Sequence, residues 1–185
     1  METTQELMQE HAAVLVALEI LDKVATAVAQ KNERAPEHLE QLLDFFKGFV
    51  DRCHHGKEED VLFPELVRRG LPREGGPIAV MLSEHEVGRS HVRAMADGLR
   101  RLSGGEAAAA AVIRDHADAY RSMLQAHIHK ENNILFPMAD RILSADVDRS
   151  LKGQFDAIER DRIGAGKHEA YHAMLHNLKE VYEIA

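Results

Sequence analysis

The sequence has one cysteine, no tryptophan and no apolar run long enough to cross a membrane. A single cysteine cannot form a disulfide within the chain, so we expect a reducing cytoplasm as its compartment. A membrane-spanning helix needs about 20 consecutive apolar residues, and the first residues, METTQELMQEH, lack the apolar segment of a secretion signal. We therefore expect no membrane partner.

Positive charge is also scarce. The chain has 31 acidic residues against 23 Lys and Arg, and its formal charge is −8. A nucleic-acid-binding protein must neutralise many phosphates, so we expect no nucleic-acid partner. The apolar share of 45% is large enough for a folded core. Twelve histidines are the clearest excess, and histidine is the commonest metal ligand in proteins.

Apolar residues recur with helical spacing through most of the chain, and alternating strand patterns are scarce. Polar or Gly- and Pro-rich breaks separate long segments, which we expect at about 4–30, 37–69, 78–102 and 106–143, with a last short helix at about 167–182. The breaks predict an all-α fold: an up-down-up-down four-helix bundle over residues 1–145, with a C-terminal helical extension over 146–185. An α-solenoid is the alternative, but no repeat of its usual length is present.

Two stretches of the chain repeat one another. HHGKEEDVLFP begins at His54, and HIHKENNILFP begins at His127. The pair Glu10-His11 similarly recurs as Glu84-His85. Each half of the chain thus has a histidine early in one helix and His-x-x-x-Glu late in the next. We interpret the Phe-Pro pair that closes each copy as structural, because proline inside a helix frees a carbonyl and bends the helix.

The spacing brings the repeated polar residues together. Residues four apart share a helix face, and a rise of about 1.5 Å per residue puts the residues of antiparallel helices at one level of the bundle. Six side chains are predicted to meet there: His11, His54, Glu58, His85, His127 and Glu131. Their neighbours are apolar, so a buried cation would remove the cost of leaving them unpaired.

The ligand set suits two metal ions. Four imidazoles and two carboxylates exceed the four ligands of one tetrahedral zinc. With about six positions on each metal, bridging carboxylates and a bridging oxo or hydroxo group leave about two positions open for a small ligand. Mixed nitrogen and oxygen ligation favours two Fe ions, with Mn or Zn as possible substitutes.

The pattern His…His-x-x-x-Glu…His…His-x-x-x-Glu, continued by K-E-x-x-x-L-F-P, resembles the hemerythrin-like (HHE cation-binding) domain family over about residues 5–143. The resemblance implies a four-helix bundle around a non-haem di-iron centre. It implies the same six ligands, with Glu58 and Glu131 bridging the metals. Oxygen-carrying hemerythrins use five histidines, whereas the aligned bundle here has four, which is more similar to the bacterial iron-repair and sensor relatives.

These features predict a di-iron protein that binds or reacts with O2, NO or peroxide, for sensing, storage or stress defence. The alternatives are a di-iron oxidase or peroxidase, and a protein that stores or donates iron. The ferritin-like pattern fits less well, because its Glu-x-x-His spacing occurs only once, in the tail. Whether the protein is an enzyme, which metal it carries and which protein partners it has are left open.

Four further residues are ambiguous at this stage. Tyr120 lies two turns before His127 and is a candidate hydrogen-bond donor or redox-active phenol beside the metals. His168 or His172 is a possible additional ligand if the last helix folds over the bundle. We favour instead a capping helix held by Leu175, Leu178 and Val181. His55 adjoins His54 but lies about 100° around the helix.

The stretch from His168 to His172 also fits H-E-x-x-H, the motif of zinc metalloproteases. The extended form of that motif needs a third histidine where this chain has Leu178. With so many histidines in the chain a chance match is easy, and we do not expect a protease.

Overall fold

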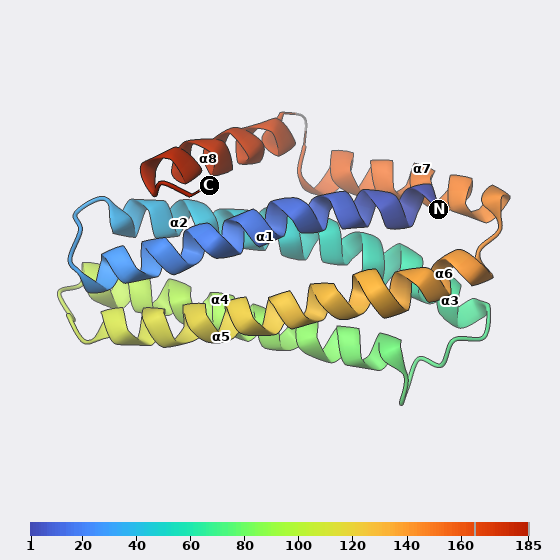
Figure 1. Cartoon of the computed structure of the whole chain (residues 1–185), viewed down its shortest axis with the longest axis horizontal. Coiled ribbons are helices and arrows are strands. Elements are labelled where there is room, and N and C mark those ends of the chain that lie inside the picture. The colour runs from blue at the N-terminus through green and yellow to red at the C-terminus, as the bar shows by residue number, and fades with distance from the viewer. Residues whose placement is uncertain (165, 185) are drawn as a thin grey trace.

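The computed structural model describes residues 1–164 and 166–184, and helices connected by short turns make up this part of the chain (Figure 1). The helices are α1 (Glu2–Ala29), α2 (Ala35–Phe45), α3 (Phe63–Arg68), α4 (Pro77–Ser103), α5 (Ala109–Lys130), α6 (Phe136–Ile142), α7 (Ala145–Arg162) and α8 (Lys167–Val181). Three π-helical segments, η1 (Phe46–His55), η2 (Glu58–Leu62) and η3 (Glu131–Leu135), join α2 to α3 and α5 to α6. None of the helices described is long and apolar enough to cross a membrane.

The four long rods of the bundle lie side by side and alternate in direction (Figure 1). They are α1, the joined α2–α3, α4, and the joined α5–α6. The predicted all-α bundle with a C-terminal helical extension is confirmed. Its connections lie at the predicted breaks: Gly70 ends α3 and Gly105 follows α4, both with the positive φ that glycine adopts without strain.

The helical hydrogen bonding changes at both copies of the repeat. The segment η2 begins at Glu58 and η3 begins at Glu131, and each ends directly before a Phe-Pro pair. Proline has no N–H to offer the carbonyl one turn earlier, and the wider π turn allows the rod to continue into α3 or α6. Because π turns concentrate at functional sites in helices, their placement marks the two glutamates.

The core consists of two apolar clusters along the length of the bundle. One is built around Leu18, Phe46 and Ile113, and the other around Phe63 and Phe136. Along α1 the first cluster begins at Val14 and the second ends at Leu7, so the two clusters flank the level of His11. The repeated polar residues therefore occupy a layer between two apolar halves.

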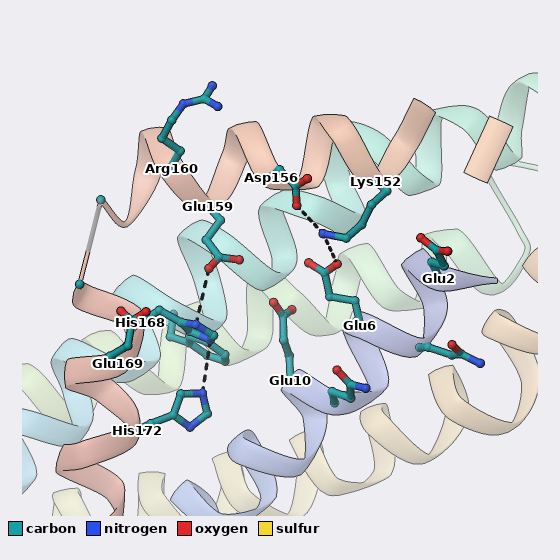
Figure 2. A pocket seen from close by; sticks show the side chains of 15 residues that line it. Glu2, Glu6, Glu10, Lys152, Asp156, Glu159, Arg160, His168, Glu169 and His172 are labelled. Atoms are coloured by element: carbon teal, nitrogen blue, oxygen red, sulfur yellow. Dashed lines mark hydrogen bonds and ion pairs between the residues drawn. The ribbon is translucent and has the colours of Figure 1, made fainter. Parts of the chain in front are cut away.

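The C-terminal extension packs on the bundle. Phe155 of α7 is fully buried in the second apolar cluster, and Leu175 of α8 is buried in the first. We predicted that Leu175, Leu178 and Val181 hold α8 against the bundle. Leu175 and Leu178 are buried, but Val181 is 55% exposed. Tyr171 of the same helix is buried instead. A wide pocket lies between α1 and the two extension helices (Figure 2). The domain boundary at residue 145 stays a prediction.

Asp148 of α7 joins the extension to the start of α1. Its carboxylate is 5% exposed and accepts hydrogen bonds from the backbone N–H of Glu2 (2.8 Å) and of Thr3 (3.2 Å), and from the Thr3 hydroxyl. The first N–H groups of a helix have no partner within it, so Asp148 caps α1 from a distant part of the chain. Burial alone would raise the pKa of Asp148, but these hydrogen bonds outweigh burial and hold the pKa below its usual value.

We expect Asp148→Ala to lower the free energy of unfolding by about 1–3 kcal/mol at pH 7, because hydrogen bonds to a carboxylate are lost. The lowered pKa means that this contribution is present above about pH 4 and is lost as the pH falls through the folded-state pKa. The difference between variant and wild type should therefore shrink toward pH 3. Urea unfolding at both pH values checks this, with Asp146→Ala as the control on an exposed carboxylate of the same helix. An equal difference at both pH values would contradict the capping role.

Candidate metal centre

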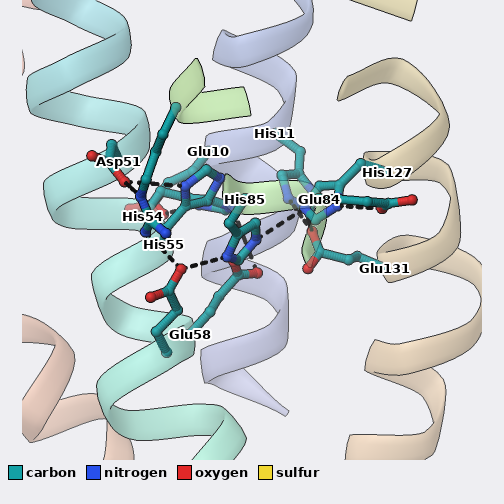
Figure 3. Close-up of polar contacts among 12 residues, drawn as sticks. Glu10, His11, Asp51, His54, His55, Glu58, Glu84, His85, His127 and Glu131 are labelled. Carbon is teal, nitrogen blue, oxygen red and sulfur yellow. Dashed lines mark hydrogen bonds and ion pairs between the residues drawn. The ribbon is translucent and has the colours of Figure 1, made fainter. Parts of the chain in front are cut away.

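The six repeated residues converge in the polar layer (Figure 3). The Nε2 atoms of His11 and His127 both lie 3.2 Å from Oε2 of Glu131. Glu58 faces the other two histidines, with Oε1 3.7 Å from Nε2 of His54 and Oε2 3.4 Å from Nε2 of His85. All six side chains are at least 98% buried. The atoms that face inward are imidazole nitrogens and carboxylate oxygens, and both are metal-ligating groups.

The polar atoms at the middle of this layer lack hydrogen-bond partners. Within the described ranges, neither carboxylate oxygen of Glu58 or Glu131 has one, and neither does Nε2 of His11. A buried, unpaired carboxylate is costly, and native proteins rarely leave such groups unsatisfied. A pair of metal ions between the carboxylates and the imidazoles would satisfy all of these atoms, so the residues fit the di-metal group that the sequence pattern predicts.

Each of the four imidazoles is held from behind through its Nδ1 atom. The acceptors are Asn132 for His11 (2.7 Å), Glu10 for His54 (2.7 Å), Glu59 for His85 (2.6 Å) and Glu84 for His127 (2.9 Å). When Nδ1 donates its proton to such an acceptor, Nε2 keeps a free lone pair that points inward. This is the arrangement by which proteins orient metal-binding histidines.

The repeat now has a structural explanation. Glu10 lies beside His11 in sequence but holds His54 of the next rod, and it also binds Nζ of Lys57. In the second half, Glu84 likewise binds both His127 and Lys130. The duplicated Glu-His and His-x-x-Lys-Glu elements thus form two copies of one Glu–His–Lys contact.

Burial and neighbouring charges shift the pKa values of the converging residues in different directions. Burial lowers the pKa of His54 to about 4, despite the opposing effect of the hydrogen bond that His54 donates to Glu10. Burial also lowers the pKa of His85. For Glu58, burial and the charge of Glu131 both raise the pKa; for Glu131, burial raises it, but His127 and His11 outweigh burial and bring it below its usual value. For His127, burial lowers the pKa, but Glu131 and Glu84 outweigh burial and bring it above its usual value. A metal ion would therefore compete with protons at Glu58 and His127, but not at His54, His85 and Glu131.

The donor atoms form two adjacent groups. One consists of His11, His54, Glu58 and Glu131, and the other of His55, Glu58, His85 and His127, and the ligand atoms within each lie within 4.8 Å of one another. Only Glu58 belongs to both, which suits a carboxylate that bridges two ions.

His55 is the member that the sequence pattern left ambiguous. Its side chain is 5% exposed, and its ring stacks on that of His85 with 3.8 Å between centroids. Its Nδ1 atom is buried without a hydrogen-bond partner in the described chain. The repeat could have predicted that His55 faces the core, because the equivalent position of the second half is an apolar residue, Ile128. His55 is therefore a core-facing histidine that only one half of the bundle has.

The two other predicted residues lie outside the donor groups. Tyr120 is buried, with its ring edge-on to Phe46, and it lines a pocket of about 80 Å³ together with His55. Burial raises the pKa of its phenol. His168 lies on α8 beside His172 and Glu159, in the wide pocket (Figure 2).

Glu58→Gln should have opposite effects on the metal-free and the metal-loaded protein. Without metal, we expect it to raise the free energy of unfolding at pH 7 by about 1–3 kcal/mol, because it removes a carboxylate that is buried without a partner. The raised pKa of Glu58 means that the stability of the metal-free wild type falls as the pH rises from about 4.3 toward the folded-state pKa. The variant lacks this loss.

With metal, Glu58→Gln should bind more weakly, because a bridging carboxylate is gone. Unfolding with a chelator and with added Zn²⁺ measures both effects, and Glu180→Gln on the exposed face of α8 is the control. A shift of the same sign in both states would contradict the role of Glu58 as a metal ligand.

Comparison with known proteins agrees with this geometry. The chain is 25% identical over 162 residues to the uncharacterized protein Rv1995 of Mycobacterium tuberculosis, which covers 86% of this chain and 62% of that protein. It is 29% identical over 141 residues to the iron-sulfur cluster repair protein YtfE of Musicola paradisiaca, covering 74% of this chain and 62% of the relative. The chain thus spans less than two thirds of the length of these relatives. The model of the Hemerythrin HHE cation binding domain matches residues 2–139, and the chain belongs to this family.

Proposed function

We propose that this protein holds two iron ions in the polar layer and that this centre binds or reacts with a small oxygen or nitrogen species such as O2, NO or peroxide. The observation that carries the proposal is the convergence of four inward Nε2 atoms on two buried carboxylates, Glu58 and Glu131, that have no hydrogen-bond partner among the described residues. Imidazole and carboxylate together suit iron, and manganese or zinc can replace it by the same chemistry.

The two donor groups suggest how the ligands divide. His11, His54 and Glu131 would hold one ion, His85 and His127 the other, and Glu58 would bridge them. Glu131, whose oxygen faces histidines of both groups, is our second bridging carboxylate. We add His55 as a fifth histidine on the ion held by His85. When bound, iron would supply a redox-active site with room for a small ligand.

The size of the nearest pocket supports a small ligand. The pocket that reaches His55 has a volume of about 80 Å³. One water occupies about 30 Å³ of the liquid, so the pocket holds a diatomic molecule or a peroxide and excludes an ordinary organic substrate. Gly88 of α4 lines it, and a Cβ atom there would lie 3.2 Å from Cε of Met123 and 3.4 Å from Cε2 of Tyr120.

Hydrogen bonds connect charged groups at this pocket to the proposed metal-binding residues. Arg89 binds Oε1 of Glu59 at 2.7 Å, and the same oxygen accepts from Nδ1 of His85 at 2.6 Å. A change in charge at the pocket can therefore reach a metal-binding histidine through two hydrogen bonds. Tyr120, with its phenol kept protonated by burial, is the residue that we assign to hydrogen-bond or electron donation toward a ligand in the pocket.

Iron donation or storage is the second candidate. It is favoured by the similarity to proteins named for iron-sulfur cluster repair, which cover 74% of this chain at 29% identity. If the ions are cargo, strong chelators should remove them quickly. If they form a resident centre, the removal of iron should be slow and should follow unfolding.

We expect the polar layer of the anaerobic protein to take up about two Fe(II) per chain and to give new visible absorption bands on exposure to NO or O2. The spectrum should be lost in Glu58→Ala and in Glu131→Ala, because each removes a ligand of the centre. Elemental analysis and absorption spectroscopy on the same samples check this, with Glu180→Ala as the surface control. Two bound irons with no spectral response to either gas would contradict the proposal.

Gly88→Leu should slow the reaction with NO several-fold while leaving the iron content unchanged, because the new side chain fills the pocket beside His55. Stopped-flow absorption of the Fe(II) protein measures the rate. Gly153→Leu is the matched control, since a Cβ atom at Gly153 of α7 would lie more than 4 Å from the described side chains outside its immediate neighbours in the helix. An unchanged rate would show that small ligands reach the centre elsewhere.

A further inference from the structure

A second cluster of potential metal ligands lies outside the bundle, in the wide pocket between α1, α7 and α8 (Figure 2). The pocket has a volume of about 840 Å³, far more than a small gas molecule needs. Its walls are rich in carboxylates, from Glu2, Glu6, Glu10, Asp156, Glu159 and Glu169. Two histidines of α8, His168 and His172, complete the wall and are not used by the centre in the polar layer.

The two histidines are arranged as a chelating pair. Their Nε2 atoms lie 3.3 Å apart (Figure 2). Two ligands about 2.0–2.1 Å from a tetrahedral metal ion are separated by about 3.3–3.4 Å, so the spacing of these atoms matches that of two ligands of one ion. The ring of His168 is held in place by stacking on Phe49, with 5.4 Å between centroids and 4° between planes. Spacing of i and i+4 keeps both rings on one face of α8.

A carboxylate stands beside this pair. Oε1 of Glu159 lies 3.5 Å from Nδ1 of His168, and its other oxygen, Oε2, lies 3.2 Å from Nζ of Lys57. Glu159 thus lies behind His168, where an acceptor at Nδ1 leaves Nε2 free to bind a metal ion. A pair of imidazoles favours a divalent transition-metal ion over calcium or magnesium, which prefer oxygen ligands alone.

The contacts continue from this pair to the buried centre. Lys57 is fully buried and binds Glu6, Glu10 and Glu159, and Glu10 in turn accepts from Nδ1 of His54 at 2.7 Å. Oxygen atoms of Glu10 and Glu159 also lie within 4.8 Å of each other and of the Cys53 sulfur. The ammonium of Lys57 thus occupies a position where three carboxylates already accommodate a cation.

We propose that His168 and His172 bind a divalent transition-metal ion through their Nε2 atoms in the wide pocket, with Glu159 holding the Nδ1 side of His168, and that this site collects metal for the centre in the polar layer. The second half of the proposal rests on the proposed function, whereas the first half is independent of it. The path inward runs from Glu159 past Lys57 to Glu10 and His54. Acidic walls concentrate cations in the pocket and so raise the rate of capture.

Zn²⁺ titration of the metal-free protein, followed by calorimetry, tests the site itself. The wild type should bind about three ions per chain, and His168→Ala/His172→Ala about two. His176→Ala is the matched control, because His176 is an exposed histidine of the same helix, and it should keep all three. Glu58→Gln/Glu131→Gln should weaken the two buried sites and leave the third. Failure of the proposed function would therefore be seen separately, as a third site without the other two.

Fe(II) loading tests the route. With limiting Fe(II), uptake by His168→Ala/His172→Ala should be several-fold slower than by wild type or His176→Ala, with the same final content of the buried centre. Equal Zn²⁺ stoichiometry and affinity in wild type and the double variant would overturn the site. An unchanged loading rate would overturn its role in supplying the centre.

Discussion

The structure depends on two carboxylates, Glu58 and Glu131, that lie at the middle of a helical bundle without hydrogen-bond partners in the described chain. Each of the four imidazoles around them donates Nδ1 to an acceptor behind it, which leaves Nε2 as the ring atom that faces inward. Negative charge in a dry core can be tolerated only with a compensating cation. The two apolar clusters on either side supply the stability that carries this polar layer, and the π segments place each glutamate within it.

The bundle and the six converging residues could be predicted because two periodicities coincide. Helical spacing puts His54 and Glu58 on one face, and the repeat shows that the same face is built a second time at His127 and Glu131. The residues behind the histidines could not be predicted in this way. Glu10 follows the repeat but acts on another rod, and Glu59 and Asn132 occupy equivalent positions with different side chains.

What sequence reasoning missed depends on how the helices rotate and dock. His55 faces the core because the backbone around it is π-helical, so the rotation expected of a regular α-helix does not apply. Val181 was expected to be buried, but α8 docks through Tyr171, whose hydroxyl lies against the backbone of Asp44 at 3.2 Å. The wide pocket depends on the angle at which α7 and α8 cross α1, which no local pattern encodes.

The two halves of the bundle are alike in sequence, but different pockets lead from the surface to the polar layer on the two sides. His55 has Ile128 as its counterpart, and the small pocket lies on the His55 side, where Lys47, Arg89 and Arg93 outnumber the one carboxylate, Asp51. The wide pocket instead reaches the side of His54 and is lined mainly by carboxylates. Opposite charge in the two pockets would let metal ions and small ligands enter by different routes. The acidic pocket would attract cations toward Glu10, and the basic pocket would admit anionic or neutral small ligands. The two donor groups of this duplicated fold are therefore inequivalent, because a single histidine and a C-terminal helix break its symmetry.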